Sequence, residues 1–371
     1  MSADLVIVLT AVLVAIPCAL LGTLLVLRQM SMMGDAISHA VLPGIVLAFF
    51  ISESLGSLAS LIGAGIFGLL TAMLVEALRN TGRVKEDSSI GIVFTALFAL
   101  GVFLVSKFAR EVHLDLNHVL YGEIAFAPLN SLMVEGVDLG PRSLWTMGLV
   151  TVLAVGLVLL LYKELKIATF DPGLAAAVGL SPVLVHYLLM GAVSVTTVGA
   201  FDSVGAILVV AFLIVPPATA YLLTERLSHM MALAVLLGAG SAVSGYYLAA
   251  IFDVAIAGTM AVVAGGFFVL TLLLSPSRGL IANLRRQHRN RRSFARDLLL
   301  AGLERLDGHA TERELARLLD WEEGCLSQTL EDASRGGFVC RPTPGKVTLT
   351  EKGWNAVRRL AGEHAPAIPA S

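Results

Sequence analysis

Long apolar segments separated by short polar stretches dominate the chain, and this pattern predicts membrane-spanning helices. A hydrocarbon core of about 30 Å requires about 20 predominantly apolar residues in a helix. Nine segments of suitable length occur before residue 276, near 5–27, 34–51, 56–78, 90–106, 143–162, 182–199, 203–223, 229–250 and 254–274. We therefore predict a mainly α fold in which a polytopic helical bundle of about nine spans occupies the membrane.

Composition and cysteine content narrow the class of protein. Hydrophobic residues make up 56% of the chain and charged residues 15%, and the mean hydropathy of +0.82 is far above that of a soluble domain. Cys18, Cys325 and Cys340 have the spacing of neither a disulfide framework nor a zinc site. Residues 5–27 lack a small-residue cleavage signature followed by a soluble domain, so we interpret them as the first span.

The distribution of basic residues predicts the orientation of the bundle. With the amino terminus outside, seven Lys and Arg side chains fall at cytoplasmic ends and three at external ends, which follows the positive-inside rule. This orientation also places the carboxyl-terminal region in the cytoplasm. Residues 1–275 contain 16 acidic and 10 basic residues, many of the acidic ones external. An acidic entrance concentrates cations.

Asp35 and His39 are the first candidate for chemistry, because they lie four residues apart in the otherwise apolar stretch Gly34–Gly44. On a helix this spacing places both side chains on one face. Ionisable groups within a membrane are expensive and normally face a bundle interior or a watery path. Carboxylate and imidazole are both ligands for divalent metals. Alternatively, Asp35 merely starts a helix and His39 is a satisfied interior histidine, and spacing alone favours neither interpretation.

A polar segment in the long external connection 107–142 is the second candidate. His118 and Glu123 lie in the stretch Asn117–Pro128, which we interpret as a short helix that dips into the mouth of the bundle. Irregular backbone at membrane depth is tolerated only where protein or water covers it. The alternative is an amphipathic interfacial helix without metal ligands, and it is at least as well supported.

A third candidate is Asp202, in the stretch Gly199–Ala206 that interrupts two apolar runs. Transport sites often lie at such discontinuities, although an external turn containing an aspartate explains the pattern as well or better. Pro216 and Pro217 follow within the seventh predicted span. Proline removes a helical donor, so the pair predicts a kink or a break.

The loop after the fifth span has the signals of a short cytoplasmic helix. Asp171 suits the cap, Pro172 the first helical position and Gly179 the end. We predict a small apolar exposed face with Phe170 as an anchor; its residues are Leu174, Ala175, Ala176, Ala177 and Val178. Such a face suits docking into a groove on a partner protein. Alternatively, the helix only connects two spans.

Together these motifs resemble the permease subunits of ATP-binding-cassette importers for manganese, zinc and iron. The resemblance covers essentially residues 1–275 and rests on four stretches: Arg28–Gly44, His118–Glu123, Phe170–Gly179 and Val198–Ala220. It implies the many-helix fold of vitamin-B12-type importers in a bacterial cytoplasmic membrane. It also implies a homo- or heterodimeric permease, an extracytoplasmic metal-binding protein and a separate ATPase subunit.

The resemblance also assigns roles to residues. Asp35 and His39 become pathway ligands for the transported metal, and 170–180 becomes the coupling helix that engages the ATPase. Asp202, His118 and Glu123 match the family patterns as further metal candidates. We expect no permanently bound cofactor, only transported Mn²⁺, Fe²⁺ or Zn²⁺, all of which Asp and His accept. No Walker phosphate loop occurs in the chain, so we assign ATP hydrolysis to the partner and no enzymatic activity to this chain.

Beyond residue 275 the chain becomes polar. We predict a basic juxtamembrane linker at 276–292, whose arginines suit anionic lipid headgroups, a soluble module at 293–366 and a tail at 367–371. The pattern of helices, a hairpin and a final helix resembles the winged helix of metal-dependent repressors. Membrane-anchored metal-responsive transcription regulation is therefore the alternative function, although nine spans exceed what an anchor requires.

The charges around the expected recognition helix, near 324–335, decide between the roles of this module. Four acidic residues flank or lie within this helix and would repel phosphate; they are Glu322, Glu323, Glu331 and Asp332. The sequence therefore favours a regulatory or structural cytoplasmic module over one that binds DNA.

Overall fold

A computed structural model describes residues 2–52, 58–108, 124–129, 131–134, 137–275, 279–343 and 345–364. Contacts between residues divide the chain into two units, Met1–Gly279 and Leu280–Ser371, and each has its own hydrophobic core. The finer boundaries expected at 292 and 366 stay a prediction. Each unit is described separately.

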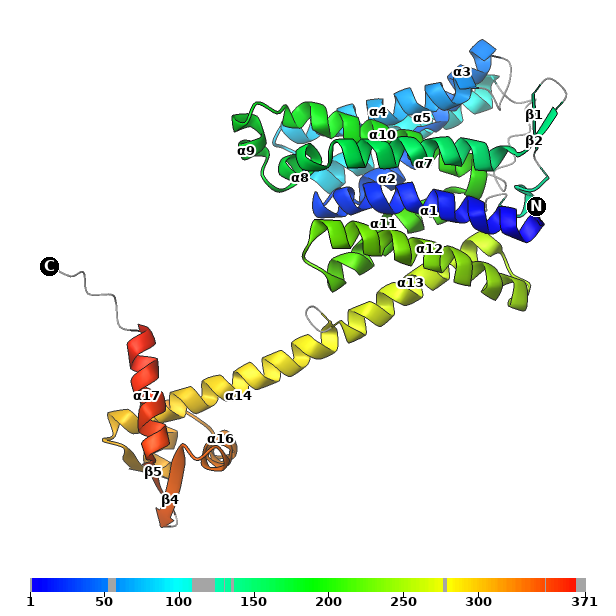
Figure 1. The fold of residues 1–371 in the computed structure, drawn as a ribbon. Helices are drawn as coiled ribbons and strands as arrows, with labels where there is room; N and C mark the ends of the chain where they lie inside the picture. The colour runs from blue at the N-terminus through cyan, green and yellow to red at the C-terminus, as the bar shows by residue number, and fades with distance from the viewer. Residues whose placement is uncertain are drawn as a thin grey trace. The chain divides into compact units, whose positions relative to one another are not determined.

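The first unit is a helical bundle with one small hairpin (Figure 1). Its helices are α1 (Ala3–Leu27), α2 (Met32–Ala40), α3 (Leu42–Ser52), α4 (Leu58–Asn80), α5 (Glu86–Phe108), the 3-10 helix η1 (Ile124–Phe126), α7 (Arg142–Leu160), α8 (Tyr162–Phe170), α9 (Pro172–Ala177), α10 (Pro182–Val204), α11 (Ala206–Leu223), α12 (Leu227–Phe252) and α13 (Ile256–Leu274). Within the described ranges, nine helical segments are long and apolar enough to cross a membrane, which confirms the predicted count.

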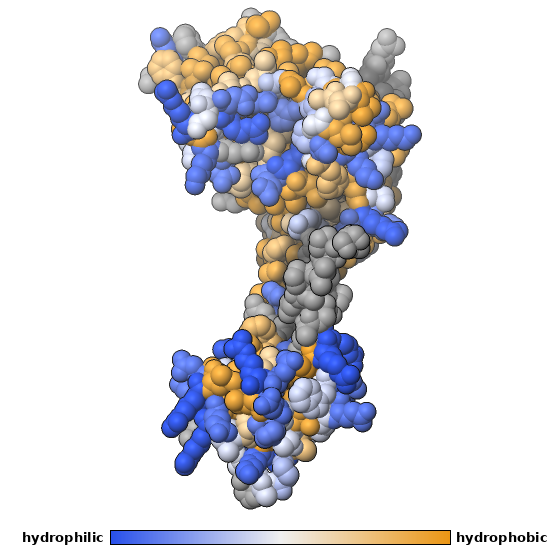
Figure 2. Space-filling view, turned by 90° about the vertical axis from the view of Figure 1, so that its left-hand side faces the viewer, coloured by the Kyte–Doolittle hydropathy of each residue, from blue (hydrophilic) through white to orange (hydrophobic). Residues whose placement is uncertain are grey.

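The two ends of the bundle carry different elements. Helices α8 and α9 lie at one end, and the amino terminus lies at the other with the antiparallel hairpin of β1 (Ser131–Val134) and β2 (Val137–Pro141) (Figure 1). Figure 2 views the α8–α9 end, where hydrophilic residues gather while apolar residues cover much of the flanks. This hairpin was not predicted from the sequence.

The second predicted span is interrupted at Val41, between α2 and α3. Pro43 has no N–H, so the His39 carbonyl loses its usual helical donor. The helical hydrogen bonds nevertheless continue on both sides of Val41. Val41 N–H donates to the Ile37 carbonyl at 3.2 Å, and Ile45 N–H donates to the Val41 carbonyl at 3.1 Å. This interruption comes two residues after His39, so both candidate ligands lie on α2, before the interruption.

The break expected around Asp202 lies further along the chain. Helix α10 continues through Asp202 to Val204, and the chain changes direction at Gly205, whose φ is 83°. A left-handed φ favours glycine, which explains why the helix ends there. The prediction that Asp202 occupies the break was therefore wrong, although its role in transport is not tested by this difference.

Two prolines in α11 do not break that helix, which runs from Ala206 to Leu223. Pro217 cannot donate to the Leu213 carbonyl, and this carbonyl faces Gly22 of α1, where an added Cβ would collide with it. Gly22 therefore permits a close approach between the two helices. Packing of this kind through small residues is common between membrane helices. The expected break was therefore wrong, and the expected kink stays a prediction.

The second unit combines four helices with a small sheet. The elements are α14 (Leu280–Arg305), β3 (His309–Thr311), α15 (Glu312–Leu319), α16 (Glu323–Arg335), β4 (Val339–Thr343), β5 (Lys346–Leu349) and α17 (Glu351–His364). The strands form an antiparallel sheet in the order β3-β5-β4. The predicted helices and hairpin are present, whereas β3 was missed. The run of basic residues at 285–292 belongs to α14 rather than to an irregular linker.

Candidate functional site

Asp35 and His39 lie in the first and last turns of α2, and their side chains face each other. The Asp35 Oδ1 and His39 Nε2 atoms are 3.6 Å apart, with side chains 34% and 36% exposed, respectively. The pair is therefore held together by the helical spacing but is not sealed in the core. Two ligand atoms remain accessible on one face of an apolar span.

The surroundings of the pair explain its orientation. Met33, Ile37 and Ala40 form the buried face of α2, each 0% exposed, so the packing of α2 directs the polar pair elsewhere. The His39 ring lies beside two α5 rings, with centroids 5.8 Å from Phe94 and 5.9 Å from Phe98. Aromatic groups thus border the imidazole and exclude water from part of its surface.

The pair alone is an incomplete metal site. In the described parts of the chain, no group of three or more His, Cys, Asp or Glu residues is placed to hold a metal ion. Structural metal sites normally have at least four ligands. Two protein ligands with an accessible face suit an ion that is bound briefly, with water or a second chain completing its coordination.

The other predicted metal candidates are not brought to this pair by the described structure. His118 and Glu123 lie outside the described residues. Asp202 lies in α10 near its carboxyl-terminal end, and its side chain is not among those that the structure describes. Their roles as ligands stay a prediction.

Helix α9 has the predicted start and stop signals. The Leu174 N–H donates to the Asp171 carboxylate at 2.9 Å, and Pro172 occupies the first turn. Gly179, which follows the helix, has a φ of 89°, a conformation that favours glycine. The cap, the proline and the glycine therefore fix a short helix at one end of the bundle.

The exposed apolar face of this segment differs in one residue from the prediction. Phe170, Leu174 and Val178 are 59%, 50% and 65% exposed, and they recur every four residues. Ala175 is 0% exposed, so its assignment to the exposed face was wrong. It packs into the core of the first unit, because a helix lying on a bundle must bury one side.

Sequence reasoning missed two polar contacts beside α9. Arg28 Nε donates to Thr169 Oγ1 at 3.1 Å, and His186 Nε2 lies 3.3 Å from Glu76 Oε2. The available signal was the presence of ionisable side chains inside or at the ends of apolar segments. Their partners were not predictable, because each contact joins helices far apart in the sequence.

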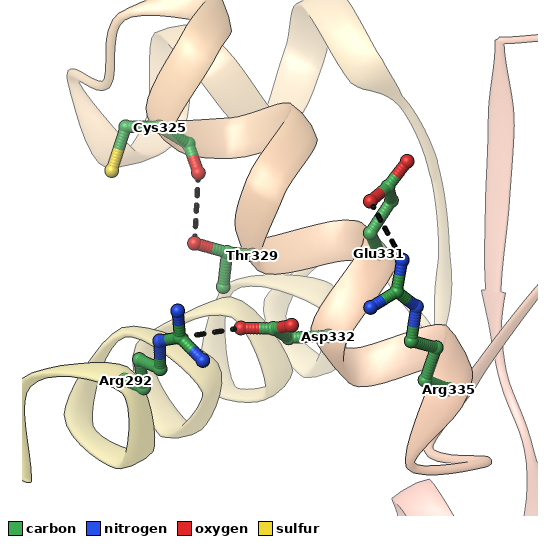
Figure 3. Close-up of polar contacts among 6 residues, drawn as sticks. All are labelled: Arg292, Cys325, Thr329, Glu331, Asp332 and Arg335. Carbon is green, nitrogen blue, oxygen red and sulfur yellow. Dashed lines mark hydrogen bonds and ion pairs between the residues drawn. The ribbon is translucent and has the colours of Figure 1, made fainter. Parts of the chain in front are cut away.

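Among the described residues of the second unit, no group of three or more His, Cys, Asp or Glu residues is placed to hold a metal ion. In Figure 3, Arg292 of α14 lies 3.9 Å from Asp332 of α16, and Arg335 lies 3.5 Å from Glu331. Both cations are therefore held by carboxylates of α16. The carboxylates partly neutralise the positive charge of these arginines, which weakens their attraction to a phosphate backbone.

Comparisons with known proteins place these features in a family. The family described as the ABC 3 transport family matches residues 5–275. The manganese transport system membrane protein MntD of Bacillus subtilis is 52% identical over 281 residues, which cover 76% of this chain and 95% of the relative. The zinc transport system membrane protein TroD of Treponema pallidum is 51% identical over 275 residues, covering 74% of this chain and 75% of the relative.

Solved structures agree with this grouping. The structure described as PsaBC from Streptococcus pneumoniae in complex with Fab matches with a TM-score of 0.62 and 34% identity, covering 73% of this chain and 91% of that one. An inward-facing metal-chelate type ABC transporter matches with a TM-score of 0.53 and 18% identity, covering 72% and 85%. This second match supports the fold alone.

Proposed function

Because the chain belongs to the ABC 3 transport family, we propose that it is the permease subunit of an importer that moves manganese or zinc ions into a bacterial cytoplasm. The observation that carries the proposal is the Asp35–His39 pair, a carboxylate and an imidazole 3.6 Å apart within a span. Both groups bind first-row divalent metals. An accessible pair of this kind in lipid is costly unless it serves a path.

The open side of the pair suggests how the path is completed. Asp35 and His39 are each about one-third exposed, and α5 beside them carries many exposed apolar side chains, including Phe98 and Phe103. We infer that a second permease subunit covers this face, so that the metal passes between two subunits. The ion would then meet the pair as a temporary site rather than as a resident centre.

The two ends of the bundle suggest the remaining partners. The exposed apolar residues Phe170, Leu174 and Val178 suit a groove on a cytoplasmic ATPase subunit. The opposite end, with the amino terminus and the β1–β2 hairpin, would face an extracytoplasmic metal-binding protein. This assignment puts the amino terminus outside and agrees with the bias of basic residues towards the α9 end.

Metal uptake by proteoliposomes tests the proposal. Vesicles containing the full-length permease, its ATPase and its binding protein should accumulate Mn²⁺ or Zn²⁺ only when ATP is supplied, with Fe²⁺ as a third metal for comparison. Asp35→Asn and His39→Ala should each lower uptake by about tenfold or more, because even outer-shell changes at metal sites cost that much.

Matched controls separate ligand loss from general damage. Asp87→Asn and His229→Gln change the same residue types at exposed positions of α5 and α12 and should transport normally. Insertion and ATPase binding should be intact in all four variants. Normal uptake by Asp35→Asn and His39→Ala would contradict the ligand assignment, whereas failure of the wild type to import either Mn²⁺ or Zn²⁺ would contradict the proposed function.

For the second unit we propose a cytoplasmic regulatory role. Its helices and hairpin resemble a winged helix, but Arg292 and Arg335 are engaged by acidic side chains. A protein-contacting module fits these charges better than a DNA-binding one. Gel-shift measurements with the full-length protein in detergent should show no saturable DNA binding at physiological salt.

A further inference from the structure

Helix α9 is flanked by two segments, and each is tied to a different span by a polar contact. Helix α8 leads into α9, and Thr169 precedes the Asp171 cap by two residues. Helix α10 begins at Pro182, shortly after α9, and His186 lies in its first turns. Contacts at Thr169 and His186 therefore hold the two sides of the same short helix.

The first contact joins α8 to the end of α1. Arg28, directly after α1, donates from Nε to Thr169 Oγ1 at 3.1 Å. Both residues are half-buried, so this hydrogen bond is partly shielded from water. A bond of a charged donor is stronger than one between neutral groups, and movement of α8 is thereby resisted by α1.

The second contact joins α10 to the end of α4. His186 Nε2 lies 3.3 Å from Glu76 Oε2, with side chains 11% and 17% exposed, and Arg79 Nη2 lies 3.7 Å from the other Glu76 oxygen. The His186–Glu76 atoms have the distance of an ion pair but lack hydrogen-bond geometry. Met30, two residues after Arg28, lines the same hollow as Glu76 and His186, so the two contacts lie close together as one group of polar residues.

This group has unused bonding capacity. Five buried side-chain nitrogen or oxygen atoms in the described part of the chain have no hydrogen-bond partner within the protein. Three of them belong to the residues of these two contacts: Arg28 Nη2, Glu76 Oε2 and His186 Nε2. Buried polar groups are normally paired. These unpaired atoms indicate that the polar residues beside α9 can form new hydrogen bonds when the helices shift.

The group also reaches the helix that carries the candidate metal ligands. One small hollow is lined by Met30, Met33, Val75, Glu76, Arg79 and His186. Met33 belongs to α2 and is 0% exposed. It precedes Asp35 by two residues, so Glu76 and His186 lie beside the start of the helix that carries the candidate ligands.

We propose that Arg28, Thr169, Glu76 and His186 are positioning residues that transmit movement of α9 to α2. The proposal rests on the proposed function, since it gives the route by which ATPase movement alters the Asp35–His39 pair. The relevant quantity is the number of metal ions imported for each ATP hydrolysed.

The first experiment removes one hydroxyl without changing side-chain shape. Thr169→Val in the reconstituted full-length complex should lower metal imported per ATP about fivefold or more, the lower end of typical coupling effects. Thr169→Ser restores the hydroxyl and should couple like the wild type. Thr146→Val is the matched control, because Thr146 Oγ1 donates only within α7, to the Arg142 carbonyl at 2.7 Å.

Binding of the ATPase to the permease is measured beside coupling, because a damaged fold would weaken both. We expect Thr169→Val to bind the ATPase normally. Unchanged coupling in Thr169→Val, or an equal loss in Thr169→Val and Thr169→Ser, would overturn the role of the Arg28–Thr169 bond.

The second experiment is a double-mutant cycle on the other contact. Glu76→Gln and His186→Gln should each lower coupling, and the double variant should lose no more than the more severe single one. Losses that multiply would show independent effects and would overturn the relay. The exposed His229→Gln on α12 serves as the control and should retain wild-type coupling.

The uptake and coupling measurements distinguish failure of the relay from failure of the proposed transport function. Wild-type vesicles that import neither Mn²⁺ nor Zn²⁺ would contradict the proposed function before any variant is compared. Wild-type import combined with normal coupling in both sets of variants would contradict the relay alone.

Discussion

At the scale of single residues, we propose that His39 is the ligand whose imidazole favours zinc over manganese. Imidazole suits zinc, whereas carboxylate and water ligands suit manganese. His39→Asp should therefore raise the ratio of Mn²⁺ to Zn²⁺ uptake, by roughly tenfold if the altered ligand acts as others at metal sites do. Competitive uptake of the two metals by proteoliposomes measures this ratio.

His39→Asn is the appropriate comparison, because it removes the imidazole without adding a carboxylate. It should lower uptake of both metals without favouring Mn²⁺. The same ratio in His39→Asp, His39→Asn and the wild type would show that this residue does not set metal preference.

A second residue-scale prediction concerns the start of α15. Glu314 N–H donates to Thr311 Oγ1 at 3.3 Å, and Thr311 N–H donates to the Glu314 carboxylate at 2.8 Å, forming a capping box. Thr311→Ala should destabilise this helix by about 1 kcal/mol. Hydrogen exchange of the full-length protein should show faster exchange in α15 and no change in the first unit.

The same capping box predicts a dependence on pH. The backbone N–H and side-chain hydroxyl of Thr311 lower the pKa of Glu314 below its ordinary value. A lowered folded-state pKa means that the stabilisation is fully present above the ordinary pKa of glutamate and is lost as pH falls through the lowered value. The protection of α15 against exchange, measured relative to the intrinsic rate at each pH, should therefore fall at acidic pH, and Glu314→Gln should weaken this pH dependence.

Contacts within one segment could be predicted from the sequence, whereas contacts between distant helices could not. Asp35 and His39 share a helix, so their spacing fixed their proximity, and Thr311 and Glu314 are likewise local. Glu76 and His186 lie on α4 and α10, whose packing no local pattern specifies. The contact between them therefore required the structure.

At the scale of elements, α9 presents one apolar side and buries another. Leu174→Glu or Val178→Glu places a charge among the exposed apolar residues and should weaken ATPase binding by about tenfold or more, as loss of a buried interface anchor does. Affinity of the reconstituted permease for the ATPase measures the effect directly. Ala176→Glu, on a different side of α9, should be milder.

Ser228→Glu controls for the added charge, because Ser228 is exposed in the first turn of α12. It should bind the ATPase as the wild type does. Normal affinity and transport in the Leu174 and Val178 variants would leave α9 as a connector between spans.

Element boundaries were harder to predict than element types. Apolar runs identified the spans, but hydropathy does not distinguish one continuous helix from two that meet at Val41. The sequence predicted an interruption somewhere in Gly199–Ala206, and only the backbone shows that it falls at Gly205, which adopts the left-handed φ. The β1–β2 hairpin was missed because its strands are short and lie in a polar connection with no clear alternation.

At the scale of the whole molecule, the chain joins a transport unit to a second folded unit. The 281-residue match to MntD of Bacillus subtilis accounts for 95% of that relative but only 76% of this chain. The match thus accounts for nearly all of that transport protein and leaves about a quarter of this chain without a counterpart in it. The core of the second unit, including Leu299, Leu315 and Leu330, is built from its own residues, which favours a separable role.

The last prediction is that truncation before the second unit leaves metal import intact and changes its regulation. Asp35, His39, α9 and all nine candidate spans precede residue 276, so the second unit supplies none of them. A module tethered to the permease meets the ATPase at high effective concentration, and even a weak contact then biases the resting state. Cys325, Cys340, His309 and His364 are candidates for metal sensing, although their scattered spacing favours ordinary roles.

Two truncations make the test sharper, because α14 begins at Leu280 and contains the basic run. Deletion of 293–371 keeps these basic residues beside the membrane, whereas deletion of 280–371 removes them with the rest of the unit. Uptake rate and inhibition by metal added on the cytoplasmic side are compared with the full-length transporter. We expect both truncations to import metal and to lose inhibition; a difference between them would assign part of the effect to the basic segment. Inhibition identical to that of the full-length protein would contradict the regulatory role, and loss of uptake in correctly inserted truncations would assign the second unit to assembly.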